Sequence, residues 1–371
     1  MTKKAILLPR KFVQGPGVIT EIGDYAKMLG TKAVVLWGKS AKAAVGEKVT
    51  ASLAAADVAM IDVGFNGETT KAEAERVAEI AKSDGASLII GIGGGKCLDA
   101  AKGAAIFAQL PHIIVPSVAS NDAPTSACTV WYDEEGVCTG FDLWPANPDY
   151  ILVDTEVIVK APFRLFAAGI GDAIATWYEA DINRQKRAVT CSGGTATLTA
   201  MAMAKLCRDT ILEYGLRAIE DIKVQALTPS VDKVIEATTL LSGIGWESGG
   251  LATAHQLANA FPALPETHHY LHGEKVSFGL VCQFCVDDDI DPDLVEATVE
   301  FQAAAGLPVT FADLNLQDVS DERLYEFCEA ATTEGSFVYN HPNTITAADL
   351  FAGMKSADAL GRRIKAQLGL A

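Results

Sequence analysis

The stretch Ala86-Ser-Leu-Ile-Ile-Gly-Ile92, followed directly by Gly93-Gly-Gly-Lys96, decides the fold class. Its apolar, glycine-bounded run predicts a buried β-strand. Alanine, leucine and isoleucine then recur at helical spacing from about Cys97 to Gln109. A buried strand that turns through glycines straight into a helix is the βα unit of a parallel sheet covered by helices.

The same alternation continues on both sides of this unit. Thr70-Lys-Ala-Glu73 has the pattern of a capping box that opens a helix, and turn residues at Glu134-Glu-Gly136 predict a hairpin. Further strands are expected at 33–37, 58–63, 112–115 and 150–154, and further helices at 42–55 and from Thr70 to about Ser83. Residues 1–160 are therefore predicted to form an α/β domain with a Rossmann-like parallel sheet.

The character of the chain changes after Ala161-Pro162. Residues 161–371 are rich in alanine, leucine and glutamate at helical spacing and carry few strand signals, which predicts a second, all-α domain. Within it, Gly169 and Gly171 precede Asp172 and suggest a helix that starts near the aspartate. On that interpretation Asp172 is either a helix N-cap or a ligand for a metal held elsewhere.

Composition limits the classes of function. The 371-residue chain has a formal net charge of −17, which disfavours binding to nucleic acids and to anionic membrane surfaces. Eight cysteines are spread along the chain, an arrangement that favours a reduced, cytoplasmic setting over a disulfide scaffold. Cys282-Gln-Phe-Cys285 lies in an apolar run without a second pair, so we interpret it as buried helix cysteines. No apolar stretch reaches the roughly 20 residues that span a bilayer.

The glycine-rich turn is the first candidate binding site. Three consecutive glycines allow close approach of the backbone, and the N-terminus of the following helix presents free N–H groups suited to a pyrophosphate. Lys96 can add a direct charge, although a tight βα turn is the simpler alternative. The loop after the next strand, Ser117 to Ser126, offers hydroxyl groups and the carboxylate of Asp122 at the same sheet edge. A purely structural polar loop explains its composition equally well.

Four of the six histidines fall between residues 255 and 272. Two imidazoles from separate elements plus a carboxylate form the usual ligand set of a catalytic zinc. His255 and His272 are the candidates, with Asp172 as the carboxylate, whereas His268 and His269 are expected to support the loop. The alternative for any single histidine is an ordinary hydrogen-bonded residue.

Together these segments resemble the glycerol dehydrogenases of the iron-containing, or group III, alcohol dehydrogenase superfamily. The resemblance covers nearly the whole chain. It is carried by Phe12-Val-Gln-Gly15, Gly91-Ile-Gly-Gly-Gly-Lys96 with Asp99, Ala119-Ser-Asn-Asp-Ala-Pro-Thr-Ser126, Ala168-Gly-Ile-Gly-Asp-Ala173, Gly245-Trp-Glu-Ser-Gly-Gly-Leu-Ala-Thr-Ala-His255 and Tyr270-Leu-His-Gly-Glu-Lys275.

The resemblance implies a dehydroquinate synthase-like fold, with the site in a cleft, and zinc held by Asp172, His255 and His272. It implies oxidation of a vicinal diol such as glycerol to the hydroxyketone dihydroxyacetone with NAD, and Asp122 as the catalytic-site residue that hydrogen-bonds the polyol. The expected cofactor-binding residues are Gly38, Gly94, Gly95, Lys96, Asp99, Ser117, Ser120, Ser126, Cys128 and Tyr132. Family members often form homo-oligomers, including octamers.

Two departures from the family pattern matter. Iron-dependent members carry a histidine four residues after the aspartate, where this chain has Thr176, and three protein ligands favour zinc. Close glycerol dehydrogenases carry an acid after the first strand, where this chain has Gly38 followed by Lys39. A carboxylate there would repel a 2′-phosphate, so use of NADP is left open.

Three other functions remain as alternatives. Glycine at position 38 also occurs in a hydroxycarboxylate dehydrogenase branch of the superfamily, which gives a 2-oxoacid reductase as one alternative. Relatives with phosphorylated substrates, namely glycerol-1-phosphate dehydrogenase and dehydroquinate synthase, are disfavoured because Gly243 to Lys275 contains one lysine and no arginine. A non-catalytic dinucleotide-binding protein is disfavoured because the candidate metal ligands and Asp122 are all present.

Overall fold

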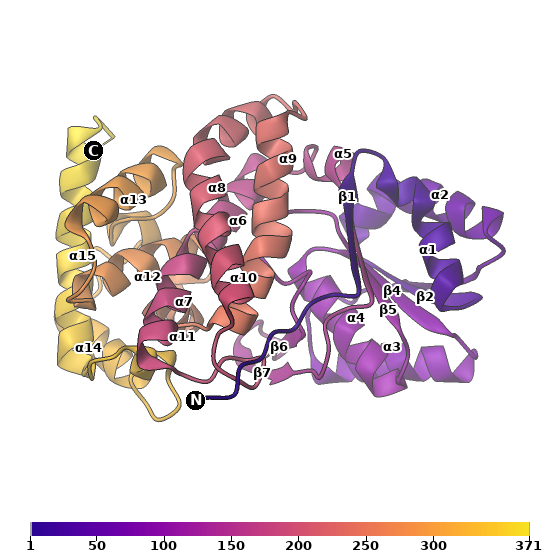
Figure 1. Ribbon diagram of the computed structural model, residues 1–371, viewed down its shortest axis with the longest axis horizontal. Helices are drawn as coiled ribbons and strands as arrows, with labels where there is room; N and C mark the ends of the chain where they lie inside the picture. The colour runs from indigo at the N-terminus through magenta and orange to yellow at the C-terminus, as the bar shows by residue number, and fades with distance from the viewer. Residues whose placement is uncertain (1, 371) are drawn as a thin grey trace. The chain divides into compact units, whose positions relative to one another are not determined.

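The computed structural model describes residues 2–370. The chain packs into two compact units (Figure 1). The sheet unit comprises Leu7–Pro162 and Asp221–Gly243. The helical unit comprises residues 2–6, 163–220 and 244–370. The chain thus crosses between the units more than once, and the assignment of separate functions to residues 1–160 and 161–371 stays a prediction.

The sheet unit is built on a parallel sheet of six strands in the order β1-β8-β5-β4-β2-β3. These strands are β1 (Lys11–Gly15), β2 (Lys32–Trp37), β3 (Ala59–Gly64), β4 (Leu88–Gly93), β5 (His112–Pro116) and β8 (Tyr150–Asp154). The expected α/β class and the strands expected from the apolar runs are confirmed. β1 was not expected, because its short run Lys-Phe-Val-Gln-Gly is only partly buried and becomes a strand through pairing with β8.

Helices cover both faces of this sheet. Successive side chains of a strand point to opposite faces, so Val35 packs with α1 (Ile22–Leu29) and α2 (Lys39–Ala55), whereas Val34 packs with α3 (Lys71–Ser83) and α4 (Gly95–Ala108). The Thr70 hydroxyl accepts from the backbone N–H of Glu73, which confirms the expected helix start. The expected hairpin is also present, as antiparallel β6 (Cys128–Tyr132) and β7 (Cys138–Leu143).

The described part of the helical unit contains helices and one isolated bridge, between Lys4 and Thr195. Its helices are α6 (Phe163–Ala173), α7 (Ala175–Lys186), α11 (Thr253–Ala260), α12 (His272–Val286), α13 (Pro292–Ala304), α14 (Asp321–Ala331) and α15 (Ala347–Gln367). α8 (Leu198–Lys223) and α10 (Ser242–Gly249) continue into the sheet unit, which also contains α5 (Thr155–Ile158) and α9 (Pro229–Glu236). Within residues 2–370, no helix has the length and apolar character required to cross a membrane.

Two glycines of α12 set the packing that matters for the site. A Cβ on Gly273 would lie 1.8 Å from the carbonyl oxygen of Ala168 in α6. A Cβ on Gly279 would lie 2.5 Å from the carbonyl oxygen of Ala254 in α11. Only glycine permits such close contacts between helices. α12 therefore lies directly against both α6 and α11, and each of these three helices carries one candidate metal ligand.

Candidate active site

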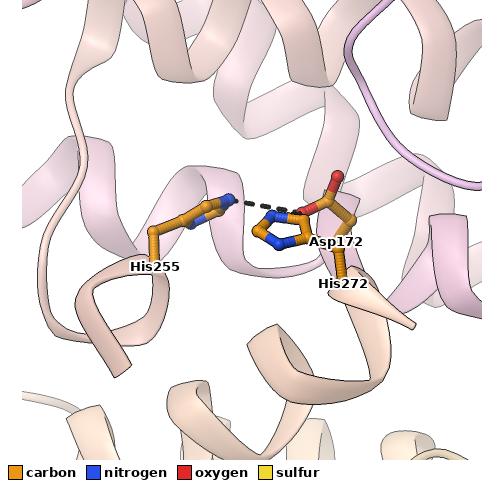
Figure 2. Close-up of side chains that lie close together, drawn as sticks. All are labelled: Asp172, His255 and His272. Atoms are coloured by element: carbon orange, nitrogen blue, oxygen red, sulfur yellow. Dashed lines mark ion pairs between the residues drawn. The ribbon is translucent and has the colours of Figure 1, made fainter. Parts of the chain in front are cut away.

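Three side chains with metal-binding atoms converge in the helical unit (Figure 2). Asp172 Oδ1 lies 3.3 Å from His255 Nε2 and 3.4 Å from His272 Nε2. One potential ligand atom from each residue lies within 4.8 Å of the other two. Asp172 is fully buried, whereas the His272 side chain is 38% exposed. The cluster is therefore a buried carboxylate with two imidazoles, one of which faces solvent.

Asp172 lies in the last turn of α6, so the expectation of a helix that starts near this residue is wrong. Gly169 and Gly171 are inside the helix rather than marking its start. At Gly171 a Cβ would lie 2.5 Å from the carbonyl oxygen of Gly273 in α12, so this position requires a small residue. Because α6 begins at Phe163, the helix N-cap interpretation of Asp172 is excluded.

His255 is held by Glu179 of α7, which is also fully buried. Glu179 Oε2 is hydrogen-bonded to His255 Nδ1, and Oε1 accepts from the backbone N–H groups of Ala252 (2.8 Å) and His255 (2.9 Å). One carboxylate thus satisfies the free N–H groups at the start of α11 and orients the imidazole. A bond at Nδ1 leaves Nε2 directed at Asp172, which is the arrangement seen when a second carboxylate supports a metal-bound histidine.

The two imidazoles differ in their electrostatic surroundings. Burial lowers the pKa of His255, but the charges of Glu179 and Asp172 outweigh burial and raise this pKa well above its ordinary value of 6.5. The His272 ring is partly exposed, yet the loss of hydration around it outweighs the attraction of Asp172 and lowers its pKa below the ordinary value. A metal bound at this cluster would therefore compete with a proton on His255, whereas His272 is the more readily available as a neutral ligand.

The position of His272 follows from the start of α12, of which it is the first residue. Glu274 accepts from the backbone N–H of Leu271 at 2.7 Å and receives two hydrogen bonds from Arg164, at 2.6 and 2.8 Å. This bidentate pair ties the start of α12 to α6, where Asp172 lies.

His268 and His269 are exposed and lie outside the group formed by Asp172, His255 and His272, which is called the metal cluster below. His268 Nε2 lies 2.8 Å from the carbonyl oxygen of Pro262. His269 Nε2 lies 3.5 Å from Asn315 Nδ2. The first contact lies within the connection between α11 and α12, and the second joins that connection to Asn315.

The donor set fits a zinc ion. One carboxylate oxygen and two imidazole nitrogens leave a further coordination position open, as catalytic zinc sites require. Thr176 stands where iron-dependent members of the family carry a fourth ligand, a histidine. Its side chain is fully buried, and its methyl carbon would lie 2.5 Å from a Cβ on Gly245. Thr176 therefore packs against α10, and the protein ligands of the cluster are Asp172, His255 and His272.

The glycine-rich turn lies at the C-terminal end of β4 in the sheet unit. Gly94 is the N-cap residue of α4 and Gly95 is its first residue, so no side chain of the cap covers the N–H groups at the start of the helix. Gly38 N donates to the Ile92 carbonyl at 2.8 Å, and Ser117 N donates to the Gly93 carbonyl at 2.8 Å. The ends of β2 and β5 therefore flank the turn, as a dinucleotide site at this sheet edge needs.

The remaining expected cofactor residues lie around α4. Lys96 pairs with Glu68 Oε2 at 2.5 Å and lies 4.4 Å from the centre of the Tyr132 ring. Asp99 is buried and pairs with Lys102. Cys128 is the buried first residue of β6, Ser126 is buried just before it, and Ser120 is half-buried in the loop that follows β5. Their role in cofactor binding stays a prediction.

Asp122 lies in the irregular segment 117–127, called the Asp122 loop below. The side chain is 8% exposed, and its Oδ2 accepts from the Ser242 hydroxyl at 2.8 Å. A Cβ on Gly243 would lie 2.9 Å from the Asp122 carbonyl oxygen. Asp122 is therefore a fixed carboxylate in the sheet unit, and its contact with a polyol stays a prediction.

Sequence reasoning missed the supporting residues. Glu179 has the spacing of a residue on the same helix face as Asp172, but nothing in the sequence connects it to His255. Ser242 and Glu274 likewise act through partners that are distant in sequence. An acid close in sequence to a candidate ligand is the one signal that was available, and it applies to Glu179 and Glu274 but not to Ser242.

Comparisons with known proteins agree with this architecture. Residues 9–155 match the family model described as iron-containing alcohol dehydrogenase. The chain is 40% identical over 359 residues to a glycerol dehydrogenase of Pseudomonas putida, covering 97% of this chain and 98% of that protein. It is 39% identical to a glycolaldehyde reductase of Halobacterium salinarum over 96% of this chain and 98% of that one. The crystal structure of a glycerol dehydrogenase from Schizosaccharomyces pombe superimposes with a TM-score of 0.94 at 32% identity, covering 100% of this chain and 94% of that one. At this identity over nearly the full length, the chain belongs to the iron-containing alcohol dehydrogenase family.

Proposed function

We propose that this chain is a zinc-dependent polyol dehydrogenase that oxidises a vicinal diol, such as glycerol, to the hydroxyketone with NAD. The observation that carries the proposal is the convergence of Asp172 Oδ1, His255 Nε2 and His272 Nε2. The glycerol dehydrogenases among its relatives support the same class of substrate.

Each ligand has a defined task in this proposal. A zinc ion bound by the cluster supplies the Lewis acidity that lowers the pKa of an alcohol hydroxyl. Asp172 provides the anionic ligand, and its complete burial strengthens its attraction for a cation. Glu179 fixes the tautomer and orientation of His255, while His272 is the ligand on the solvent side.

The proposed cofactor site uses the turn before α4. NAD supplies the hydride acceptor. The free backbone N–H groups at the start of α4 bind the pyrophosphate, and Lys96 adds a positive charge beside them. We assign Asp122 the role of hydrogen-bonding a polyol hydroxyl, because its carboxylate is held in place by Ser242. Because Gly38 follows β2, no carboxylate there would repel the 2′-phosphate of NADP, and both NAD and NADP should be tested as cofactors.

The decisive experiment removes the metal. A chelator applied to the purified protein is expected to abolish NADH formation from glycerol, and added zinc should restore it. Full activity in protein shown to be free of zinc would contradict the metal assignment. A parallel panel of glycerol, 1,2-propanediol, dihydroxyacetone, glycolaldehyde and hydroxyacids, each with NAD and NADP, identifies the substrate.

A hydroxyaldehyde is the second candidate substrate, because one relative of 39% identity is a glycolaldehyde reductase. Reduction of glycolaldehyde with a higher kcat/KM than that of dihydroxyacetone would favour this reading of the same site.

The proposal extends to a homo-oligomer, up to an octamer, in the cytoplasm. All eight cysteines are free thiols. Two large apolar side chains of the helical unit, Val189 and Leu198, are 71% and 82% exposed, which an interface between copies would cover. Light scattering tests this point, since a single species of 39.1 kDa would exclude assembly.

A further inference from the structure

Lys102 of α4 carries a charge in the interior of the sheet unit. The residue is 1% exposed, although lysine is almost never fully buried without a partner. Its ammonium group lies 2.7 Å from Asp99 Oδ1 and donates to the carbonyl oxygens of Ala123 (2.9 Å) and Ser126 (3.2 Å). The Ser126 hydroxyl lies at 3.4 Å as well. An ammonium group has three N–H donors, and these acceptors are enough for all of them.

All of these acceptors except Asp99 belong to the Asp122 loop. The carbonyls of Ala123 and Ser126 lie just after Asp122, in a segment without regular secondary structure. Asp99 meanwhile accepts from the backbone N–H of Val130 through Oδ2 at 2.9 Å. Lys102 and Asp99 therefore connect three parts of the sheet unit, namely α4, the Asp122 loop and β6.

We propose that Lys102 is a positioning residue that fixes the Asp122 loop against α4, with Asp99 as its counter-charge rather than a direct ligand of the cofactor. This inference rests on the proposed function, in which Asp122 binds a polyol hydroxyl.

Stability alone does not explain a buried ion pair. Removing two charges from water is costly, and replacing such a pair by apolar side chains of similar size is often neutral or stabilising. The contacts of Lys102 go to main-chain carbonyls of an irregular loop, whose conformation no helix or strand ladder enforces. A hydrophobic side chain in the same space could not form directional hydrogen bonds to that backbone.

Neutral variants of similar size separate positioning from charge balance. Lys102→Met leaves Asp99 as an uncompensated buried charge, which is strongly destabilising. The double variant Lys102→Met/Asp99→Asn removes both charges and is expected to recover the thermal midpoint. Val77→Ala in α3 is a control, because Val77 packs in the core beside α4 and the change destabilises the unit without touching Lys102.

The measurements are the thermal midpoint, the KM and kcat for the diol, and hydrogen exchange of the Asp122 loop amides. We expect the double variant to regain stability while its KM for the diol stays raised by about tenfold or more, since a displacement of about 1 Å can cost up to about a hundredfold. Its loop amides should exchange faster than in the wild type, whereas Val77→Ala should leave both the KM and the loop exchange unchanged.

A wild-type KM in the double variant, or loop exchange equal to that of the wild type, would overturn the inference and leave the pair a purely structural one. Failure of the proposed function gives a different result, because the wild-type protein itself would then oxidise no diol. Hydrogen exchange of the loop still decides the positioning role in that case.

Discussion

The metal cluster and the glycine-rich turn are built in opposite ways. The turn is contiguous, Gly93 to Lys96, and offers backbone groups at a helix N-terminus. The cluster takes one side chain from each of three helices, and distant residues support it, such as Glu179 for His255 and Arg164 with Glu274 at the start of α12. A backbone site therefore depends on local conformation, whereas a side-chain site depends on packing between distant segments. Substitutions should separate the two sites.

The largest effect is expected from Asp172→Asn. The change keeps the size of the side chain but removes the anionic ligand, and the electrostatic stabilisation from a bound metal is worth several kcal/mol, so kcat/KM for glycerol should fall roughly a thousandfold or more. Binding of NAD at the glycine-rich turn, measured by a tryptophan fluorescence titration, should be unchanged.

Asp181→Asn is the matched control for this variant. Asp181 lies on α7 in the same helical unit, but its carboxylate is partly exposed and pairs with Arg184. Its replacement should leave both activity and zinc content at the wild-type level. Loss of NAD binding in Asp172→Asn would show that the two sites are not separable.

The contrast between the two sites also explains what the sequence predicted. The parallel sheet and the turn followed from contiguous patterns, because a buried strand, a glycine turn and an apolar helix face are local properties. His255 and His272 were selected from four histidines because they lie in separate elements, and the family resemblance implied the same pair. Their convergence on Asp172 depends on Gly273 and Gly279, whose packing role no local pattern reveals.

A smaller effect is expected from Glu179→Gln, which acts on His255 alone. The amide can still accept the two backbone N–H groups at the start of α11, but it no longer offers His255 Nδ1 a carboxylate. Loss of such a supporting group usually weakens metal binding by about 10- to 100-fold. Competition with a chromogenic chelator measures the zinc Kd. Excess zinc should restore activity here but not in Asp172→Asn, and an unaltered Kd would remove Glu179 from the metal site.

Gly38→Asp tests the cofactor turn instead. Gly38 has an extended backbone that any residue adopts, and a Cβ there would lie 3.3 Å from Gly93 Cα, so a small side chain needs only a slight adjustment. A carboxylate beside the adenosine ribose repels a 2′-phosphate, and the ratio of kcat/KM for NADP to that for NAD should fall about tenfold. Gly38→Asn, of equal size but uncharged, is the control. An equal fall in both variants would assign the effect to size rather than to charge.

The smallest effect is expected where the sequence is most suggestive, at His268 and His269. Both lie in the histidine-rich stretch, yet their nearest partners are the Pro262 carbonyl and Asn315, outside the metal cluster. Alanine at either position removes an exposed contact, and exposed substitutions usually change free energies by at most about 0.5 kcal/mol, so the zinc Kd should stay within about twofold of the wild type. His272→Ala, a few residues away, should instead lose zinc at the concentrations used. A marked loss of zinc in His268→Ala or His269→Ala would mean that the loop before α12 contributes a ligand, and that the cluster is less dependent on helix packing than Gly273 and Gly279 indicate.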